Sequence, residues 1–133
     1  MIKLKQILLE NYDFEVEPFT TMDDRDDTTE GYRLYMNNEW VATFSRDDNE
    51  ASNENYFYIQ YFEIDDEFRG KGLIFVIFDA IKRYIRKEFK WAKGIELDAD
   101  ASSGISNKQQ LTQMYKGLGF KQTEKGTLLY LFS

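Results

Sequence analysis

A glycine-rich turn at residues 69–72, with the sequence Arg-Gly-Lys-Gly, has the residue types most suited to binding a charged ligand. It follows a strand-like run at residues 56–64 and precedes a long amphipathic pattern over residues 72–90. At such a junction the first N–H groups of the helix have no partner within the helix, and the helix dipole favours an anion. The turn therefore predicts a site for a phosphate or diphosphate group. Its spacing is neither that of a P-loop nor that of the dinucleotide-binding fingerprint.

Catalysis in this chain would depend on carboxylates, tyrosine, lysine, backbone groups or water, because the chain contains no histidine and no cysteine. This absence excludes Ser-His-Asp and Cys-His systems, disulfides and thiolate metal sites. Glu63, in the strand-like run, is the first candidate for a general base, followed by Glu96 and Asp98 on a neighbouring run. Each of the three can equally be a polar residue on an outward strand face. No metal site is expected, since the acidic stretch at residues 20–31 lacks the spacing of an EF-hand.

The composition predicts a single domain spanning residues 1–133 with a real hydrophobic core, because the chain has 133 residues, 17% of them aromatic, and one proline. A net charge of -7 disfavours binding to nucleic acid or to an anionic membrane and favours a cationic partner. No apolar run approaches the roughly 20 residues that cross a bilayer. Residues 1–10 lack the features of a signal peptide, so we expect a cytoplasmic protein.

Hydrophobic periodicity and turn residues predict the elements that must position these groups. We expect a helix at 2–10, a strand at 14–19 closed by Pro18, a polar loop at 20–31, a hairpin of strands 32–36 and 40–44 turning at residues 37–39, a loop at 46–55, a strand at 56–64, a helix at 72–90, a strand at 95–99, a helix from Ser106 to about 116, and a hairpin of 120–123 with 127–132. The strand, helix and strand between residues 56 and 99 predict a parallel βαβ crossover. The fold class is therefore α+β, with a mixed, mostly antiparallel twisted sheet of six to seven strands and flanking helices.

Two motifs in this order resemble those of a known family. Arg69 and Gly72 fill the first and fourth positions of the pattern Arg or Gln, two variable residues, Gly, one variable residue, Gly or Ala. Residues 115–120 match a second pattern, Tyr, two residues, then Leu-Gly-Phe. Both resemble the GNAT superfamily of N-acetyltransferases, and the resemblance covers roughly half of the chain. The chain departs from the family at the sixth loop position, Ile74, and at the asparagine before the last helix, which falls at Lys108, one residue past Asn107.

The resemblance implies a GNAT-like fold that transfers an acetyl group from acetyl-CoA to a primary amine by direct attack in a ternary complex. It implies that the backbone near Phe62 and Ile64 pairs with the pantetheine arm and polarises the acetyl carbonyl. It also implies that Tyr115 protonates the leaving thiolate, although this residue can equally be a half-buried aromatic. The other cofactor-binding positions that it implies are Arg69, Gly70, Lys71, Gly72, Leu73, Ile74, Asn107 and Lys108.

The acceptor stays open at this point, since a protein lysine or N-terminus, a polyamine or another small amine would each suit an acidic protein. A homodimer is compatible with the strand edges and the aromatic C-terminal hairpin. The alternative function is a catalytically degenerate protein of the same fold that uses its acidic surface to bind or inhibit a basic partner.

Overall fold

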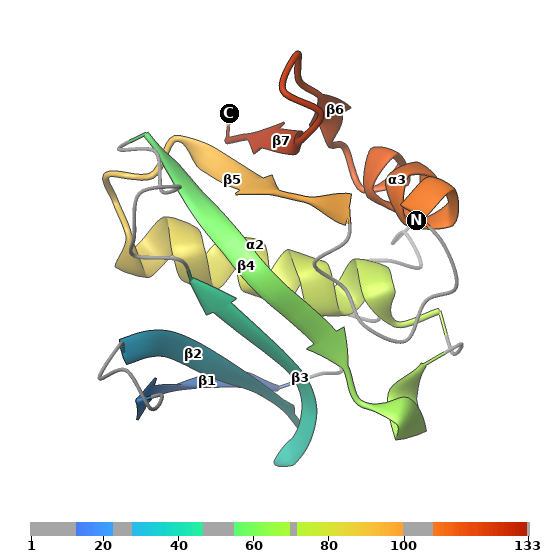
Figure 1. Cartoon of the computed structure of the whole chain (residues 1–133). Helices are drawn as coiled ribbons and strands as arrows, with labels where there is room; N and C mark the ends of the chain where they lie inside the picture. The colour runs from blue at the N-terminus through green and yellow to red at the C-terminus, as the bar shows by residue number, and fades with distance from the viewer. Residues whose placement is uncertain (1–12, 23–27, 47–54, 70–71, 100–107, 133) are drawn as a thin grey trace, which may run out of the picture.

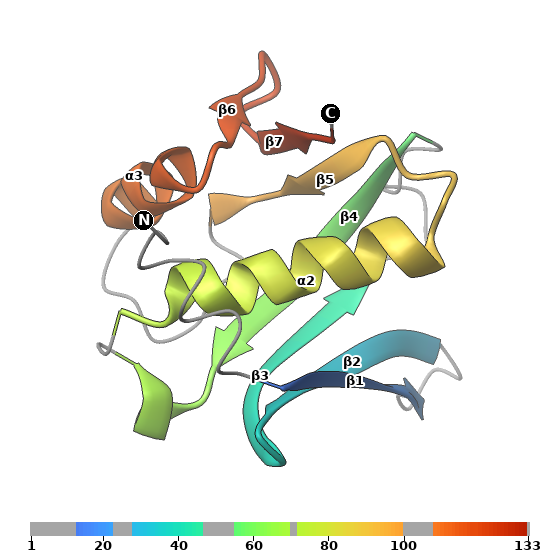
Figure 2. The ribbon, with the colours of Figure 1, turned by 180° about the vertical axis from the view of Figure 1, so that it is seen from behind.

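The computed structural model describes residues 13–22, 28–46, 55–69, 72–99 and 108–132. Seven strands of this part of the chain form one twisted sheet, and a long helix, α2 (Ile74–Glu88), crosses one face of it (Figure 1, and from behind in Figure 2). The other helix of more than one turn among the described residues is the shorter α3 (Lys108–Gly117). The helix expected over residues 2–10 lies outside the described residues.

The strands follow the order β1-β2-β3-β4-β5-β7-β6, and each neighbouring pair is antiparallel except β4 with β5. Their bounds are β1 (Phe14–Met22), β2 (Thr28–Met36), β3 (Glu39–Arg46), β4 (Tyr56–Ile64), β5 (Gly94–Leu97), β6 (Lys121–Gln122) and β7 (Leu128–Leu131). Helix α2 connects the two parallel strands. The predicted class, a mixed and mostly antiparallel sheet with a parallel βαβ crossover, is therefore confirmed.

The first hairpin extends further than its sequence suggests. A polar loop is predicted over residues 20–31, whereas β1 continues to Met22 and β2 begins at Thr28. The two strands pair without interruption from Phe14 opposite Met36 to Met22 opposite Thr28. The loop prediction is wrong on both sides of residues 23–27, which lie outside the described residues. The strand also does not close at Pro18, because β1 is an edge strand and its outer side needs no N–H donor.

The turn between β2 and β3 confirms the second predicted hairpin. Asn37 and Asn38 have φ angles of 52° and 69°, the positive values that a two-residue hairpin turn requires. Glu39 belongs to β3 rather than to the turn. The backbone N–H of Asn37 donates to the carbonyl of Asp13 (2.8 Å), and its side-chain oxygen accepts from the N–H of Asp13 (2.9 Å). These bonds connect the turn to the start of β1.

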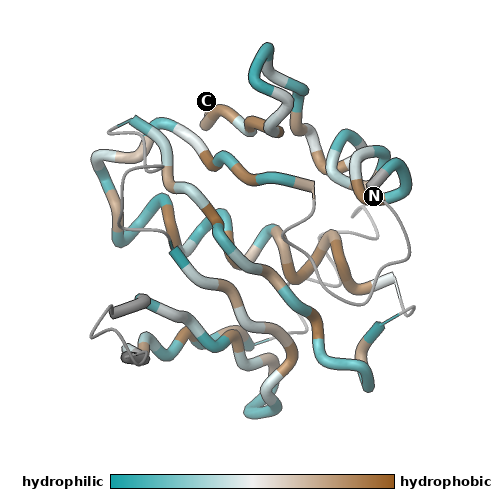
Figure 3. Tube along the Cα trace, in the orientation of Figure 1, coloured by the Kyte–Doolittle hydropathy of each residue, from teal (hydrophilic) through white to brown (hydrophobic). Residues whose placement is uncertain are grey.

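Helix α2 packs its apolar stripe on the sheet and forms the core. Its buried residues are Val76, Ile77, Phe78, Ala80, Ile81 and Ile85, and all of them except Val76 share one hydrophobic cluster with inward residues of β2 to β5. Figure 3 shows hydrophobic and hydrophilic residues alternating along the central strands. Each fully buried side chain of this kind stabilises the fold by roughly 1.5–3 kcal/mol. Among the described residues, no helix has the length and apolar character needed to cross a membrane.

The ends of α2 lie inside the predicted range of 72–90. Gly72 has a positive φ of 72°, which is outside the helical region, and Phe89 leaves it at φ -120° and ψ 73°. Phe89 still donates its N–H to the carbonyl of Ile85 (2.8 Å) and packs against the ring of Phe57 at 5.0 Å between centroids. The chain therefore leaves the helix with its last aromatic side chain held in the core.

Helix α3 ends in a Schellman motif. The N–H of Phe120 donates to the carbonyl of Tyr115 (3.0 Å), and the N–H of Gly119 donates to the carbonyl of Lys116 (3.1 Å). Gly119 has the positive φ of this motif, 104°. The rings of Tyr115 and Phe120 lie 5.4 Å apart and make the hydrophobic contact that accompanies it. The predicted capping residue Ser106 lies outside the described residues, and the C-terminal hairpin is confirmed as β6 and β7.

Candidate functional site

Strand β4 contains a β-bulge at Gln60. Ser45 of β3 lies opposite Tyr61 and Arg46 lies opposite Ile59, so Gln60 is an extra residue on the β4 side. The burial pattern shows the same irregularity, because Phe57 and Ile59 are buried, Gln60 and Tyr61 are both exposed, and Phe62 is buried again. A bulge bends its strand and increases the local twist. The second half of β4 therefore runs in a different direction from the first.

Beyond the bulge, β4 and β5 separate. Their parallel pairing covers Tyr56 to Ile59 on β4 and ends at the pair Ile59 and Leu97. Figures 1 and 2 both show the two strands diverging toward the end of β4. No strand in the described part of the chain pairs with residues 60–64 of β4 on the β5 side. We call this side of residues 60–64 the open edge.

The open edge presents two particular N–H groups. The N–H of Asp65 donates to the carbonyl of Val41 (2.9 Å), so it points toward β3. Successive N–H groups of a strand point to opposite sides, which directs the N–H groups of Phe62 and Ile64 to the open edge. The side chain of Phe62 is buried, at 2% exposure, and Ile64 packs against the core. The two backbone positions implied by the family resemblance are thus donors at the open edge.

A short 3-10 turn and Gly72 lead from the open edge to α2. The turn η1 (Asp66–Phe68) follows β4 directly, and the N–H of Phe68 donates to the carbonyl of Asp65 (2.8 Å). Leu73 is the N-cap residue of α2, and its side chain makes no capping bond. The first turn of the helix contains no acidic residue. The helix begins with the bond from the N–H of Ile77 to the carbonyl of Leu73 (2.9 Å). Leu73 therefore provides no side-chain cap to the preceding N–H groups of α2. Gly70 and Lys71 lie outside the described residues.

The side chain of Ile74 packs against the hydrophobic core together with that of Leu73. The β-branched residue at the sixth loop position is thereby accommodated in the first helical turn as a partly buried residue that packs against the core. The aromatic ring of Phe75, by contrast, is 50% exposed.

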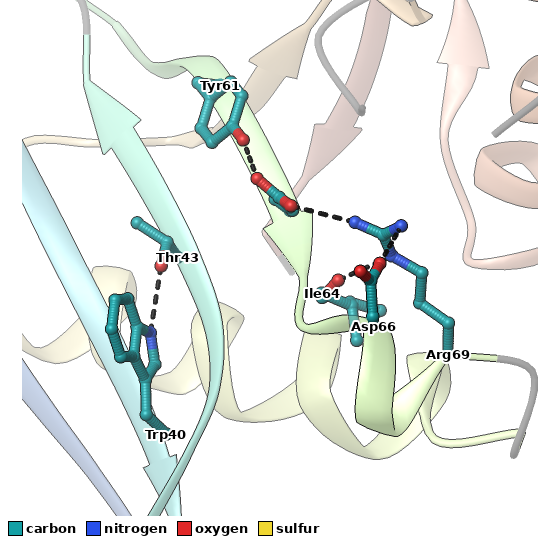
Figure 4. A network of polar contacts seen from close by, with 7 residues as sticks. Trp40, Thr43, Tyr61, Ile64, Asp66 and Arg69 are labelled. Atoms are coloured by element: carbon teal, nitrogen blue, oxygen red, sulfur yellow. Dashed lines mark hydrogen bonds and ion pairs between the residues drawn. The ribbon is translucent and has the colours of Figure 1, made fainter. Parts of the chain in front are cut away.

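Arg69 folds back along the end of β4, as Figure 4 shows. Its Nε donates to the carbonyl of Ile64 (2.7 Å), and one terminal nitrogen donates to a carboxylate oxygen of Glu63 (2.9 Å). The other terminal nitrogen forms an ion pair with Asp66. The implied phosphate contact of Arg69 therefore competes with three contacts inside the protein.

Glu63 lies beside Tyr61 on the face of β4 that is opposite the buried Phe62. Its carboxylate accepts hydrogen bonds from the hydroxyl of Tyr61 and from Arg69. Thr43 of β3 is the cross-strand partner of Glu63 and accepts a hydrogen bond from the indole of Trp40 (3.0 Å; Figure 4). Tyr61 was not identified from the sequence, although its position two residues before Glu63 on the same strand face was a usable signal.

Glu96 is the buried charged residue of the described chain, at 9% exposure. It lies on β5 opposite Tyr58, one residue before the two strands separate. Its carboxylate accepts from the hydroxyl of Thr127 (2.6 Å), which is 2.7 Å from that of Thr123. No described lysine or arginine forms an ion pair with it. Asp98, the third candidate base, is only partly buried.

Charged side chains are rarely buried unless they are paired, and the hydrogen-bond partner of Glu96 among the described residues is the hydroxyl of Thr127. Glu96 therefore becomes a stronger candidate for acid–base chemistry than its sequence position suggested. Thr127, its partner, precedes the last strand and carries no sequence signal of such a role.

Tyr115 is fully buried, with 0% exposure, and is the largest such side chain among the described residues. Its position in the Schellman motif explains the pattern of Tyr115, Gly119 and Phe120 in purely structural terms. Phe120 also contacts Phe78 of α2 (5.2 Å between centroids), which places the second family motif beside the helix that follows the first. Asn107 lies outside the described residues, and Lys108 is the first residue of α3.

Two surface cavities formed by described residues lie away from the open edge. One, of 430 Å³, lies between β1 and α2, and the other, of 340 Å³, lies over β1 and β2. No group of three or more aspartate, glutamate, histidine or cysteine residues in the described ranges is arranged to hold a metal ion. The residues near the open edge thus supply hydrogen-bond donors, a buried carboxylate and a helix start.

A scan against protein-family models found no matching family, and a search of the curated proteins found no match for this chain.

Proposed function

We propose that this protein is an acetyl-CoA-dependent N-acetyltransferase of the GNAT superfamily, which acetylates a primary amine in the cytoplasm. One observation carries the proposal: along the chain, the open edge of β4 is followed by η1 and then by a helix whose N-cap residue, Leu73, provides no side-chain cap. An elongated ligand with amide groups at one end and a diphosphate at the other matches this succession of donors. Acetyl-CoA has that chemistry.

The residues present suit such a ligand in two ways. Phe62 directs both its N–H and its carbonyl to the open edge, so it can pair with an amide of the pantetheine arm as a neighbouring strand would. The N–H groups at the start of α2 can receive the diphosphate, favoured by the helix dipole. The order of elements and the parallel β4–β5 crossover agree with the fold that the family resemblance implies.

Transfer requires that the attacking amine lose a proton and that the thiolate gain one. Two carboxylates lie near the divergence of β4 and β5, Glu63 on β4 and Glu96 on β5. We assign the proton acceptor to Glu96, because Glu63 already accepts from Tyr61 and Arg69. An N–H group of the open edge would polarise the acetyl carbonyl, a contribution that is worth about 3–4 kcal/mol where one such donor has been removed. The assignment of Tyr115 as the acid that protonates the leaving thiolate is supported only by the family resemblance.

A second function is favoured by the burial of Tyr115 and by the structural explanation of its motif. If that motif is only a helix cap, the chain is a binding protein of the same fold. Exposed Asp65, Asp66 and Glu67 beside the open edge would then face a basic partner, in keeping with the net charge of -7. This protein would bind its partner without any need for acetyl-CoA.

Binding of CoA and acetyl-CoA, measured by calorimetry and thermal shift, tests the proposal. At a hundred times its dissociation constant the ligand should stabilise the fold by about 2.7 kcal/mol. Ile64→Pro removes an N–H of the open edge that the sheet does not use, and it should abolish binding while circular dichroism stays unchanged. Ile64→Val keeps this N–H and should bind as the natural protein does.

Absence of any CoA binding by the natural protein would contradict the proposal and favour the binding protein. Binding that Ile64→Pro leaves intact would show that the ligand does not use the N–H of Ile64 at the open edge. If binding is confirmed, mass spectrometry after incubation with labelled acetyl-CoA and a panel of peptides, polyamines and small amines identifies the acceptor.

A further inference from the structure

The guanidinium group of Arg69 has a protein partner for each of its three nitrogen atoms. Nε donates to the carbonyl of Ile64, and the two terminal nitrogens meet Glu63 and Asp66. The side chain is only 28% exposed. A planar group that is held by three partners in three directions has a fixed position. Arg69 is therefore part of the local structure at the end of β4.

The bond to Ile64 has a direct consequence for the open edge. Within a strand, the carbonyl of a residue points to the same side as its N–H, so the carbonyl of Ile64 also faces the open edge. Nε of Arg69 occupies this acceptor. At Ile64 the open edge therefore offers only a backbone N–H to a ligand, because Arg69 occupies the carbonyl. At Phe62 it offers both the N–H and the carbonyl. Arg69 thus defines where pairing along β4 stops.

The two carboxylate contacts fix the turn that follows. Glu63 belongs to β4 and Asp66 to η1, so Arg69 connects the strand to the turn between β4 and α2. The charge of Arg69 is also compensated by these two carboxylates, and Asp65 and Glu67 nearby are exposed. A phosphate at this point would gain little from the positive charge of Arg69.

We infer that Arg69 is a positioning residue, which orients the open edge and the turn leading to α2 through its bond to Ile64 and does not itself bind the phosphates of the ligand. This inference rests on the proposed function and assigns Arg69 a role different from the phosphate contact expected from its sequence position. A glutamine amide at position 69 can donate to the same carbonyl without a charge, so it separates the hydrogen bond of Arg69 from its charge.

Calorimetry with CoA on three variants tests this role. Arg69→Ala should weaken CoA binding by a factor of ten or more, since it removes the bond to Ile64. Arg69→Gln should bind within about threefold of the natural protein, with an unchanged salt dependence, because the hydrogen bond is retained. Arg83→Ala, which removes an exposed arginine paired with Asp79 on α2, is the matched control and should bind normally. Equal weakening in Arg69→Gln and Arg69→Ala, with a reduced salt dependence in both, would instead show a direct phosphate contact.

Amide hydrogen exchange of the free protein tests the same role without any ligand. The N–H groups of Asp65 and Phe68, which are hydrogen-bonded at the end of β4 and in η1, report on the turn. Their exchange should accelerate at least tenfold in Arg69→Ala and stay near the natural rate in Arg69→Gln. Unchanged exchange in Arg69→Ala would overturn the inference even if CoA binds. Accelerated exchange in a protein that does not bind CoA would keep the structural role of Arg69 and reject the proposed function.

Discussion

At the scale of single residues, the clearest chemical feature is a buried carboxylate that accepts a hydrogen bond from a threonine hydroxyl, which in turn lies within hydrogen-bond distance of a second threonine hydroxyl. Glu96 is hydrogen-bonded to Thr127 and lies where β4 and β5 begin to separate. Glu63, the first candidate from the sequence, is instead engaged by Tyr61 and Arg69. The two carboxylates therefore differ in burial and in partners, and this difference predicts different roles.

Glu96→Gln should lower the turnover of the proposed transfer by about 10² to 10⁴, the range attributed to a general base. The glutamine carbonyl can still accept from Thr127, so the melting temperature should not fall. Glu63→Gln should have a smaller effect on turnover, because Glu63 binds Arg69 and is not assigned as the proton acceptor. The measurement is steady-state turnover at saturating amine, after CoA binding has been shown for both variants. A larger loss in Glu63→Gln than in Glu96→Gln would restore Glu63 as the base.

At the scale of elements, the second family motif coincides with a helix terminator. Tyr115 and Phe120 supply the ring contact, and Gly119 supplies the positive φ that the Schellman motif needs. An ideal Cβ at Gly119 would also lie 3.0 Å from the ring of Tyr130. Gly117 has neither a positive φ nor an atom within 4 Å of such a Cβ. The two glycines therefore form a matched pair for measuring what the motif contributes.

Gly119→Ala should lower the free energy of unfolding by about 1–2 kcal/mol, from the left-handed conformation alone. Gly117→Ala should leave it unchanged or raise it slightly, because alanine restricts the unfolded chain more than glycine does. Urea denaturation followed by circular dichroism gives both values. Equal effects of the two substitutions would contradict the assigned cap.

At the scale of the whole molecule, the two outer edges of the sheet carry features that oppose pairing with another sheet. Pro18 lies in the middle of β1 and lacks an N–H, and β6 has only two residues, both exposed. Edge strands with such features rarely add further strands. Homodimerisation through these edges is therefore disfavoured, and a homodimer would need another surface.

The stability of the molecule should decline in alkaline solution because of two tyrosines. Burial, together with the nearby charge of Glu30 and the hydrogen bond to it, raises the pKa of Tyr32 far above its ordinary value of 10.0. Burial also raises the pKa of Tyr84. A raised pKa in the folded state means that the unfolded chain loses these protons first, so stability is full below pH 10 and falls above it.

The free energy of unfolding should drop by at most about 1.4 kcal/mol per pH unit for each of these groups above pH 10. Tyr32→Phe should make the decline shallower without removing it, since Tyr84 still titrates. Unfolding by urea at a series of pH values from 8 to 11 gives the slopes. An identical slope in the natural protein and in Tyr32→Phe would show that Tyr32 titrates alike in both states.

The sequence determined most of the elements, because their signals are local. The apolar period of α2, the paired asparagines at residues 37 and 38, and the aromatic run of β4 each depend on neighbours a few residues away. The βαβ crossover followed from the order of these elements. The loop error at residues 20–31 arose because Gly31 and polar residues indicate a turn. In the sheet, however, the ring of Phe19 covers Gly31 so closely that an ideal Cβ there would lie 2.3 Å from it.

Only the tertiary structure decided the contents of the candidate site, because they depend on contacts between distant segments. The bulge at Gln60 is defined by the register with β3, and the open edge by where β5 stops pairing. The carboxylate of Glu96 is hydrogen-bonded to Thr127, which lies 31 residues further along the chain. Sequence spacing can place a residue on a strand, but the partner strand and the packing around it decide which of its groups remain available to a ligand.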